Sequence, residues 1–334
     1  MTAPAAPRDA LVGADEAAPE LPVCDHYCGT EPRMAKALAL QAELGAVFDI
    51  TLDCEDGAPV GAEAEHAALC ARIALSAANR YGRVGARVHP VDHPAFEADL
   101  QTLIGQAGGR LAYLMVPKPR DADDVRHAVA RVQAVAAASG RGAALPVHVL
   151  VETHGALRDV FAIAAEPRVE SISFGLMDFV SAHRGAIPQS AMGVQGQFDH
   201  PLVLRAKLEI AAACHAHGKT PSHCVVTEFK DTAALSAAAL QARMRLGYTR
   251  MWSIHPDQIR PIVAAFAPTA EELDQAIAIV SAAQAAQWAP IQHGGVLHDR
   301  ASYRYFWQVI ARAQRSAVAG GPAVPADLQA AWFA

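Results

Sequence analysis

Two apolar stretches in the middle of the chain each lead to a carboxylate. Residues 147–151 run directly into Glu152, and residues 169–175 are followed shortly by Asp178. Between them, apolar residues recur at helical spacing over residues 156–165. This pattern predicts a strand, a helix and a second, parallel strand. Both carboxylates then lie at the carboxyl ends of neighbouring strands.

The same alternation of short apolar runs and helical periodicity extends over most of the chain. Strands are predicted at residues 21–28, 46–53, 84–88, 111–116, 147–151, 169–175, 224–227 and 250–254. Helices are predicted at residues 31–44, 62–79, 94–104, 121–138, 156–165, 201–215, 232–246 and 269–288. A unit of about 31 residues, repeated eight times, fits a (β/α)8 TIM barrel with an extra C-terminal helical segment. A doubly wound open sheet is the alternative, but no GxGxxG motif follows an early strand.

The two ends of the chain depart from this rhythm. Residues 1–21 are acidic and rich in Pro and Ala, which predicts a disordered tail. We assign residues 22–289 to the barrel and residues 290–334 to a C-terminal loop and helix. Residues 304–310 give that helix a strongly apolar face with nothing left to cover it in its own barrel. This face predicts packing on a neighbouring subunit, and therefore a homo-oligomer.

Composition narrows the class of protein. The chain has 334 residues, of which 52% are hydrophobic, and a net charge of −6. No basic patch for nucleic acid or an anionic membrane surface is expected, and no apolar run reaches the roughly 18 residues that span a bilayer. The start of the chain lacks a secretory signal, so we expect a cytoplasmic protein with six reduced cysteines. Cysteines lie near histidines at residues 24–28 and 214–224, but neither segment repeats a CxxC pair, so zinc is not expected there.

Two carboxylates at neighbouring strand ends form a candidate metal site. In parallel α/β folds, the carboxyl ends of the strands carry the active site. Mg²⁺ takes oxygen ligands, commonly from one or two carboxylates, and keeps waters that substrate oxygens can replace. Glu152 and Asp178 are therefore candidate Mg²⁺ ligands. The alternative is that both are strand-end caps or solvated loop charges.

Other polar residues collect at the same predicted rim. Glu55 and Asp56 follow the second strand, Arg87 ends the third and Lys118 follows the fourth. A metal at this rim can chelate a 2-oxo acid, and Arg87 can stabilise the enolate charge that develops beside it. The alternative for Arg87 is a salt bridge to a barrel acid. For Lys118 we favour a structural pair with Glu152.

Three further positions at the rim have simpler interpretations. His89 and His255 end the third and eighth strands, where histidines more often bond to the backbone than act as catalysts. Gly175 lies next to the second carboxylate segment and allows close packing or close approach of a ligand.

A series of short motifs carries a family resemblance. They are EPRMAKAL (31–38), LDCEDGA (52–58), ARV (86–88), MVPK (115–118), VETHGAL (151–157), FGLMD (174–178), SIHPDQI (253–259) and FAPTAEELDQAIAIV (266–280). In order and spacing, from about residue 22 to residue 315, they resemble the citrate lyase beta-subunit and malyl-CoA lyase family. This family belongs to the broader aldolase/citrate lyase superfamily of metal-dependent barrels.

The resemblance implies a Mg²⁺-dependent lyase that cleaves or forms a carbon–carbon bond in 3-hydroxyacyl-CoA thioesters of the malyl, citramalyl or citryl type. Coenzyme A is then part of the substrate, and the reaction passes through an enolate. By matched position, Glu152 and Asp178 are the metal ligands. We also expect Glu152 and Gly175 to lie beside the substrate. Arg87 matches an arginine that contacts the substrate.

Further assignments follow from the same resemblance. Glu55 and Asp56 match an acidic pair after the second strand and are assigned catalytic roles. Asp299, in GVLHDR, matches an aspartate that reaches a neighbour's active site. Arg33 and Lys36 match basic positions near the coenzyme A entrance. Members usually form trimers or hexamers, so the resemblance implies one of these states.

The chain also departs from the family pattern. His89 stands where many members have Asn, Met177 stands where Glu usually precedes the metal aspartate, and CDHYCGTEP (24–32) replaces a Pro-Gly element. Three alternatives therefore stay open. They are a metal-dependent aldolase for free 2-oxo acids, a Schiff-base aldolase using Lys118, and a non-catalytic member that binds CoA esters or a partner protein.

Overall fold

The structure is a computed structural model that describes residues 5–12, 21–316 and 320–333. The chain divides into two compact units. The larger is Pro19–Ile262, and the smaller combines Met1–Ala18 with Val263–Ala334. Each unit is described separately. Among the described residues, none of the helices is both long enough and apolar enough to cross a membrane.

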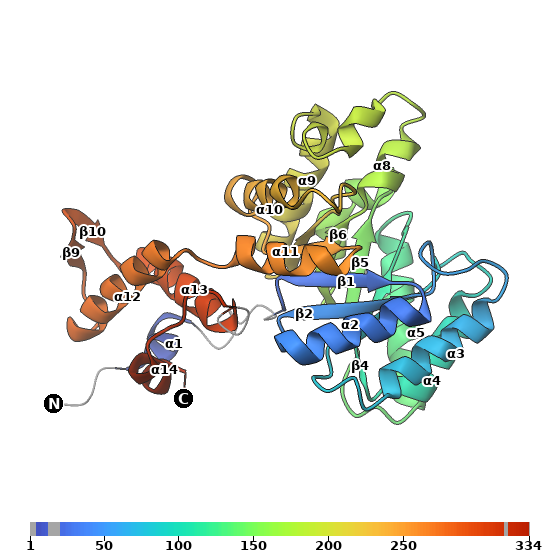
Figure 1. Cartoon of the computed structure of the whole chain (residues 1–334), viewed down its shortest axis with the longest axis horizontal. Coiled ribbons are helices and arrows are strands. Elements are labelled where there is room, and N and C mark those ends of the chain that lie inside the picture. The colour runs from blue at the N-terminus through green and yellow to red at the C-terminus, as the bar shows by residue number, and fades with distance from the viewer. Residues whose placement is uncertain (1–4, 13–20, 317–319, 334) are drawn as a thin grey trace. The chain divides into compact units, whose positions relative to one another are not determined.

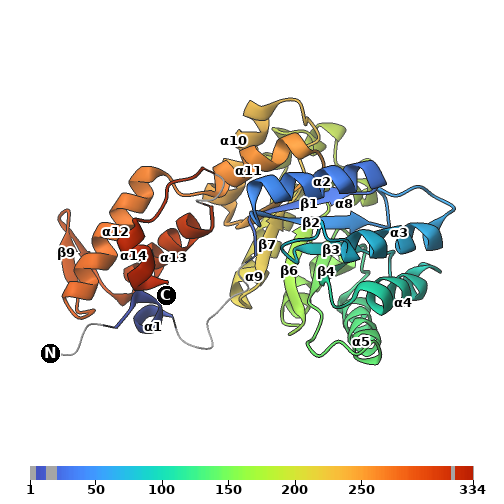
Figure 2. The ribbon, with the colours of Figure 1, turned by 60° about the horizontal axis from the view of Figure 1, so that its bottom comes forward.

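The larger unit is a closed barrel of parallel strands in sequence order, from β1 round to β8 and back to β1. Figures 1 and 2 show the strands enclosed by helices. The strands are β1 (Cys24–Cys28), β2 (Phe48–Asp53), β3 (Val84–Arg87), β4 (Leu111–Val116), β5 (Val147–Val151), β6 (Val169–Phe174), β7 (Thr220–His223) and β8 (Arg250–Ser253). The predicted TIM barrel is confirmed.

Helices follow the strands and cover the outside of the barrel. They are α2 (Glu31–Leu44), α3 (Glu63–Leu75), α4 (Phe96–Ala107), α5 (Ala122–Ala138), α6 (His154–Arg158), α7 (Val160–Ala164), α8 (Leu176–Ala182), α9 (Pro201–Ala216), α10 (Thr232–Leu246) and α11 (Ile259–Phe266), which crosses the boundary between the units. Helix α5 illustrates the local logic, because the Asp121 side chain caps it by accepting from the Asp124 N–H, and Val125, Val129 and Val132 are buried on one face.

Among the predicted elements, one strand is shifted and one helix is divided. Strand β7 covers Thr220–His223 and not residues 224–227. Its sequence, TPSH, has no apolar alternation and contains a proline, which lacks the N–H of a central strand, yet all four residues are buried between β6 and β8. The helix predicted at 156–165 is broken at Asp159 into α6 and α7.

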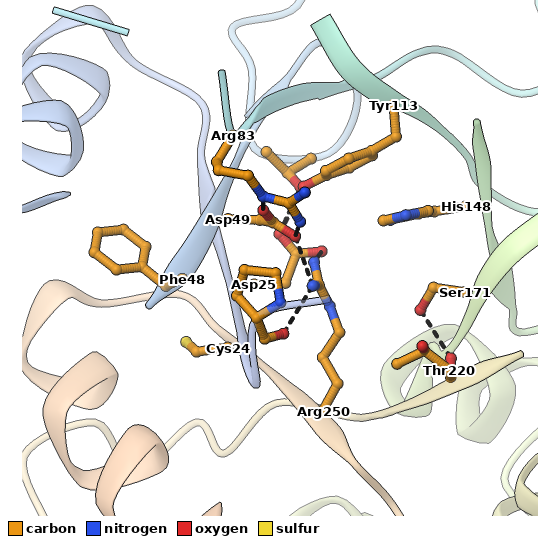
Figure 3. Close-up of polar contacts among 12 residues, drawn as sticks. Cys24, Asp25, Phe48, Asp49, Arg83, Tyr113, His148, Ser171, Thr220 and Arg250 are labelled. Carbon is orange, nitrogen blue, oxygen red and sulfur yellow. Dashed lines mark hydrogen bonds and ion pairs between the residues drawn. The ribbon is translucent and has the colours of Figure 1, made fainter. Parts of the chain in front are cut away.

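The starts of the strands hold a buried network of charges (Figure 3). Arg250 Nη1 lies 2.6 Å from Asp49 Oδ2, and its Nη2 lies 3.0 Å from Asp25 Oδ2. Arg83 adds a second guanidinium, with Nε 2.6 Å from Asp49 Oδ1. Tyr113 donates to Asp25 from β4. Because these groups lie at the amino ends of the strands, opposite the rim used for catalysis in such barrels, we assign them to stability.

The smaller unit has its own apolar core, built from α1 (Pro7–Leu11), α12 (Ala270–Ala285), α13 (Arg300–Ser316) and α14 (Ala326–Trp332). A hairpin of β9 (Ile291–His293) and β10 (Val296–His298) precedes α13. Tyr303, Trp307 and Ile310 on α13 are buried in this core together with Leu11. Most of the apolar face of the C-terminal helix is therefore covered within its own unit, and Tyr305 is the exposed exception. The burial of this face removes the main argument for packing on a neighbouring subunit, which stays a prediction.

The domain boundaries also need correction. The barrel unit ends at Ile262 and not at residue 289, because α12 packs with α13 in the smaller unit. The predicted disordered tail of residues 1–21 is wrong for residues 7–11, which form α1. Leu11 is buried there, and Arg304 Nε donates to its carbonyl at 3.1 Å. Residues 1–4 and 13–20 of that segment lie outside the described residues.

Candidate active site

The carboxyl end of β2 and that of β3 are joined by a buried ion pair. Asp53 and Arg87 are opposite each other in the parallel register. Arg87 donates from Nε to Asp53 Oδ1 at 2.7 Å and from Nη2 to Oδ2 at 2.6 Å. The turn after β2 wraps the same carboxylate, since the N–H groups of Glu55 and Gly57 donate to it at 3.0 and 2.9 Å. Asp53 therefore fixes the arginine and the turn together.

Glu55 is the next acid along this turn and forms an ion pair with the same guanidinium. Arg87 Nη1 is 3.0 Å from Glu55 Oε2, an ion pair that lacks hydrogen-bond geometry. Burial raises the pKa of Glu55 in spite of the opposing effects of Arg87 and Lys118. A carboxylate with a raised pKa and an oxygen that accepts no hydrogen bond can take up a proton during a reaction.

The ammonium of Lys118 contacts three acids of the rim. Its Nζ lies 2.5 Å from Glu55 Oε1, 2.8 Å from Asp56 Oδ2 and 3.7 Å from Asp178 Oδ1. Burial opposes the charge, but hydrogen bonds to Asp56 and Glu55 outweigh it and raise the pKa of Lys118. The expected side-chain pair with Glu152 is wrong, because Glu152 Oε1 accepts the backbone N–H of Lys118 at 3.0 Å.

Glu152 is buried at the end of β5, with 3% of its surface exposed. Burial, followed by the charge of Asp178, raises the pKa of Glu152 well above its usual value. Gly175, after β6, provides the room, since a Cβ there would come within 2.1 Å of Glu152 Oε2. The sequence prediction of close packing at Gly175 is confirmed.

These groups have the donor set and the charge for a hard divalent cation. Two cations, Arg87 and Lys118, share the rim with a larger number of carboxylates, namely Asp53, Glu55, Asp56, Glu152 and Asp178. Lys118 contacts Glu152 through its backbone N–H and Asp178 through its ammonium. A divalent ion would relieve the repulsion between these two carboxylates. Both offer oxygen ligands, which Mg²⁺ prefers. The residues present therefore fit the ion that the sequence predicts.

Aromatic side chains from other strands line the barrel beside Arg87. Tyr27 and Trp252 stack at 4.5 Å between ring centroids and pack with Met115 and Leu150. The Arg87 guanidinium carbon lies 5.3 Å from the centre of the Tyr27 ring. Within the described part of the chain, the Tyr27 hydroxyl and Trp252 Nε1 are buried without a hydrogen-bond partner. The sequence reading missed both, because each also fits a plain core position.

The remaining predicted residues are dispersed. Arg33 and Lys36 are exposed on α2, which follows the carboxyl end of β1. Asp299 belongs to the smaller unit, where its Oδ1 accepts the Ala301 N–H at 3.0 Å. The structure thus groups Glu55, Asp56, Arg87, Glu152, Gly175 and Asp178, and leaves the roles of the other three as predictions.

The two histidines at strand ends each have a local hydrogen-bond partner. His89 Nδ1 lies 2.7 Å from Asp99 Oδ2, so its partner is a carboxylate and not the backbone that we expected. His255 Nδ1 accepts the Asp257 N–H at 3.2 Å and so caps a short 3₁₀ turn, and its ring stacks on Phe229.

The family model described as HpcH/HpaI aldolase/citrate lyase matches residues 29–256. The chain belongs to the HpcH/HpaI aldolase/citrate lyase family. This membership confirms the resemblance described from the motifs, and the match spans the whole rim from α2 to the end of β8.

Individual relatives and solved structures are similar over most of the chain. A crystal structure described as a citrate lyase from Burkholderia xenovorans LB400 is 54% identical, covers 99% of both chains and has a TM-score of 0.85. The L-malyl-CoA/beta-methylmalyl-CoA lyase of Cereibacter sphaeroides is 28% identical over 78% of this chain and 83% of its own. CitE from Mycobacterium tuberculosis, solved with magnesium, acetoacetate and coenzyme A, shares the fold at 20% identity and a TM-score of 0.67, covering 88% and 98% of the two chains. The relatives with a named activity among these are lyases.

Proposed function

We propose that this chain is a Mg²⁺-dependent carbon–carbon lyase that cleaves or forms 3-hydroxyacyl-CoA thioesters of the malyl, citramalyl or citryl type. The observation that carries the proposal is the buried carboxylate of Glu152 beside Asp178, on the same rim as the fixed Arg87. The names of the family relatives, which include a malyl-CoA lyase and a citrate lyase, support the same class of substrate.

Glu152 and Asp178 would hold the magnesium ion, and Gly175 would keep Glu152 in place. When bound, the ion supplies Lewis-acid polarisation of the carbonyl oxygen of the 2-oxo acid fragment. The complex of a structural neighbour with magnesium and coenzyme A supports this choice of ion. Asp178 is free to serve as a ligand once it moves away from Lys118, from which it is separated by 3.7 Å.

Arg87 stabilises negative charge on the substrate. Asp53 occupies two of the five N–H groups of the guanidinium, at Nε and Nη2, which fixes the plane of the fork. The Nη1 end, which lies 3.0 Å from Glu55 Oε2 without hydrogen-bond geometry, is then the end that would donate to an enolate oxygen. Because Arg87 is buried and held by Asp53, it needs little reorganisation as that charge develops.

Cleavage requires two proton transfers. The 3-hydroxyl loses its proton to a base, the bond between C2 and C3 breaks, and its electron pair enters the thioester enolate. The enolate carbon then takes a proton and becomes acetyl-CoA. We assign the proton transfers to Glu55, whose pKa is raised, and to Asp299 from a neighbouring copy in a trimer or hexamer. Asp56 forms an ion pair with Lys118. We assign Arg33 and Lys36, which are exposed on α2, to binding the coenzyme A phosphates.

Assays with purified protein test the proposal. The chain is incubated with Mg²⁺ and malyl-CoA, citramalyl-CoA or citryl-CoA, and release of acetyl-CoA is followed. We expect turnover that requires Mg²⁺, and Asp178→Ala should lose both turnover and the rise in melting temperature that Mg²⁺ gives. Gln292→Ala, at an exposed position in the smaller unit, is the control.

Three other outcomes would overturn the proposal in different ways. Pyruvate-forming cleavage of free hydroxy-oxo acids, indifferent to coenzyme A, would establish the free-acid aldolase. Melting shifts with CoA esters but no turnover would establish a binding protein. Turnover that survives chelation of all metal would exclude the magnesium mechanism.

A further inference from the structure

A second cluster of metal-ligating side chains lies between the end of β2 and α3. Cys54 directly follows β2, and His66 and Cys70 come from α3. One ligand atom from each of the three lies within 4.8 Å of the others, and all three residues are buried. His66 and Cys70 are four residues apart, so they share one face of the helix. The helix and the strand end thus present two thiols and an imidazole to one point.

The spacing of the two sulfurs matches a bound metal ion. Cys54 Sγ and Cys70 Sγ are 3.6 Å apart. Two thiolates on a tetrahedral Zn²⁺, each at about 2.3 Å from the metal, lie about 3.8 Å apart. A disulfide would require about 2.05 Å, so the pair would have to close considerably to form one. The sulfurs are therefore already spaced for tetrahedral coordination.

His66 makes the backbone hydrogen bond that metal-ligating histidines commonly make. His66 Nε2 lies 2.8 Å from the Asp53 carbonyl oxygen, which fixes Nε2 as the protonated nitrogen and the donor. The other ring nitrogen then carries a lone pair. A histidine that donates one ring N–H to a backbone carbonyl and offers the other nitrogen is the usual arrangement around zinc.

We propose that Cys54, His66 and Cys70 form a site for a thiophilic d¹⁰ cation, Zn²⁺, distinct from the carboxylate site at the rim. The ligand types separate the two sites, since thiolates and imidazole select Zn²⁺ whereas carboxylates suit Mg²⁺. Three protein ligands leave the fourth tetrahedral position for water.

The local chemistry agrees with this assignment. The hydrogen bond between the two thiols lowers the pKa of Cys70 to about 6 and, with burial, raises that of Cys54. Cysteine binds a metal as the thiolate, so binding at this pair releases protons.

A metal ion at this site would stabilise the turn after β2. Cys54 lies between Asp53, which holds Arg87, and Glu55, which lies under it. His66 also grips the Asp53 carbonyl. An ion shared by the strand end and α3 would therefore limit movement of the turn that carries both acids.

Cobalt substitution tests the site directly. Reduced, full-length protein is stripped of metal and titrated with Co²⁺, then with Zn²⁺, in the presence of excess Mg²⁺. We expect one Co²⁺ per chain with thiolate-to-metal charge-transfer bands and intense tetrahedral bands in the visible, displaced by Zn²⁺ and not by Mg²⁺. Cys54→Ala and Cys70→Ala should lose these bands, and Cys214→Ala, a buried cysteine on α9, should keep them.

The contrary results are equally distinct. Absence of the charge-transfer bands in the reduced wild-type protein would overturn the proposal, as would their persistence in both cysteine variants. If either variant fails to fold, His66→Gln provides a second test, because its amide can still donate to the Asp53 carbonyl. Unchanged Zn²⁺ affinity in a folded His66→Gln protein would remove His66 from the site. These readouts do not depend on lyase activity, so they stand apart from the test of the proposed function.

Discussion

Asp53 and Arg87 face each other across β2 and β3 and share two parallel hydrogen bonds of 2.7 and 2.6 Å. The alternative weighed for Arg87, a salt bridge to a barrel acid, is therefore confirmed, and it does not exclude a role in binding substrate. The bridge uses one edge of the guanidinium and orients the other. Asp53 is a positioning residue for Arg87, although the sequence marked it only as the end of a strand.

Substitution at either member of this pair should reduce turnover. Asp53→Asn replaces one acceptor oxygen with an NH₂ that faces an N–H of Arg87, so the fork loses its fixed plane. Arg87→Lys replaces the fork with a point charge. We expect kcat to fall by about 10²–10³-fold in Arg87→Lys, as when a fixed oxyanion donor is removed, and by less in Asp53→Asn.

The matched control lies at the opposite end of the barrel. Arg83 and Asp49 form a similar bidentate pair at the strand starts. Arg83→Lys should leave kcat and KM close to those of the wild type. Equal losses in Arg83→Lys and Arg87→Lys would show that the effect is one of stability and not of position.

Gly175 offers a way to disturb the metal site without touching a ligand. An added Cβ would lie 2.1 Å from Glu152 Oε2 and 2.5 Å from its Cβ, so Gly175→Ala must push Glu152 aside. We expect Mg²⁺ affinity, measured by calorimetry, to fall by at least about tenfold, which corresponds to about 1.4 kcal/mol. Gly105→Ala, on α4 with open space around its Cβ, is the control. Unaltered Mg²⁺ binding in Gly175→Ala would contradict the placement of the ion at Glu152.

Lys118 should not form a Schiff base with a 2-oxo acid. A Schiff-base lysine needs a neutral amine and hence a lowered pKa, whereas hydrogen bonds to Asp56 and Glu55 raise the pKa of Lys118 in spite of burial. Borohydride reduction in the presence of pyruvate should therefore leave the protein mass unchanged. A covalent adduct on Lys118 in the mass spectrum would restore the Schiff-base aldolase as an alternative.

The rim was predictable from sequence to the extent that it depends on the barrel. Once strands end at Asp53, Arg87 and Glu152, a parallel closed sheet must bring these positions to one rim. The pairing of side chains was not predictable in the same way. Lys118 reaches Glu55, Asp56 and Asp178 with its ammonium because its backbone, with φ at 48°, turns the N–H and not the side chain toward Glu152.

Two other features escaped the sequence for physical reasons. Strand β7 is held by neighbours on both sides, which overrides the weak strand preference of Thr220–His223. Cys54, His66 and Cys70 come together from a strand end and a helix. The cysteines that lie close to histidines in the sequence are instead those at residues 24–28 and 214–224. In both cases the deciding contacts are tertiary and leave no local pattern.

Magnesium binding should depend on pH through Glu152. Burial and then the charge of Asp178 raise the pKa of Glu152, so its protonated form persists above the usual range. The ion competes with that proton, so affinity should rise with pH and level off once Glu152 is ionised. Below its pKa, each unit of pH should change the apparent Kd by about tenfold. Calorimetry in buffers of different ionisation enthalpy would count the proton released.

The Asp178→Asn variant separates this explanation from a general effect of acid. It removes the neighbouring charge, so the pKa of Glu152 should fall and the pH midpoint of the weaker binding should move down. An affinity that is independent of pH, or a midpoint that does not move in Asp178→Asn, would contradict the role of Glu152.

Arg250 should be essential for stability and not for chemistry. It is fully buried with Asp25 and Asp49, and Arg83 is the other cation of the network (Figure 3). Arg250→Met leaves two carboxylates in a space that excludes water, and breaking a buried ion pair in this way costs about 3–5 kcal/mol. We expect a loss of that size in the free energy of unfolding measured with urea. Arg83→Met should lose less, because the Arg83 side chain is 25% exposed and water can replace part of its contact with Asp49.

A double variant identifies the cause of that loss. If uncompensated buried charge is responsible, Asp49→Asn in the Arg250→Met background removes one stranded carboxylate and should restore part of the stability. If lost packing of the long arginine side chain is responsible instead, the second substitution should give no recovery, and the two effects should add. Recovery of stability in the double variant would distinguish the role of charges at the base of the barrel from their role at the catalytic rim. Charged residues at the rim serve the reaction, whereas those at the base stabilise one another.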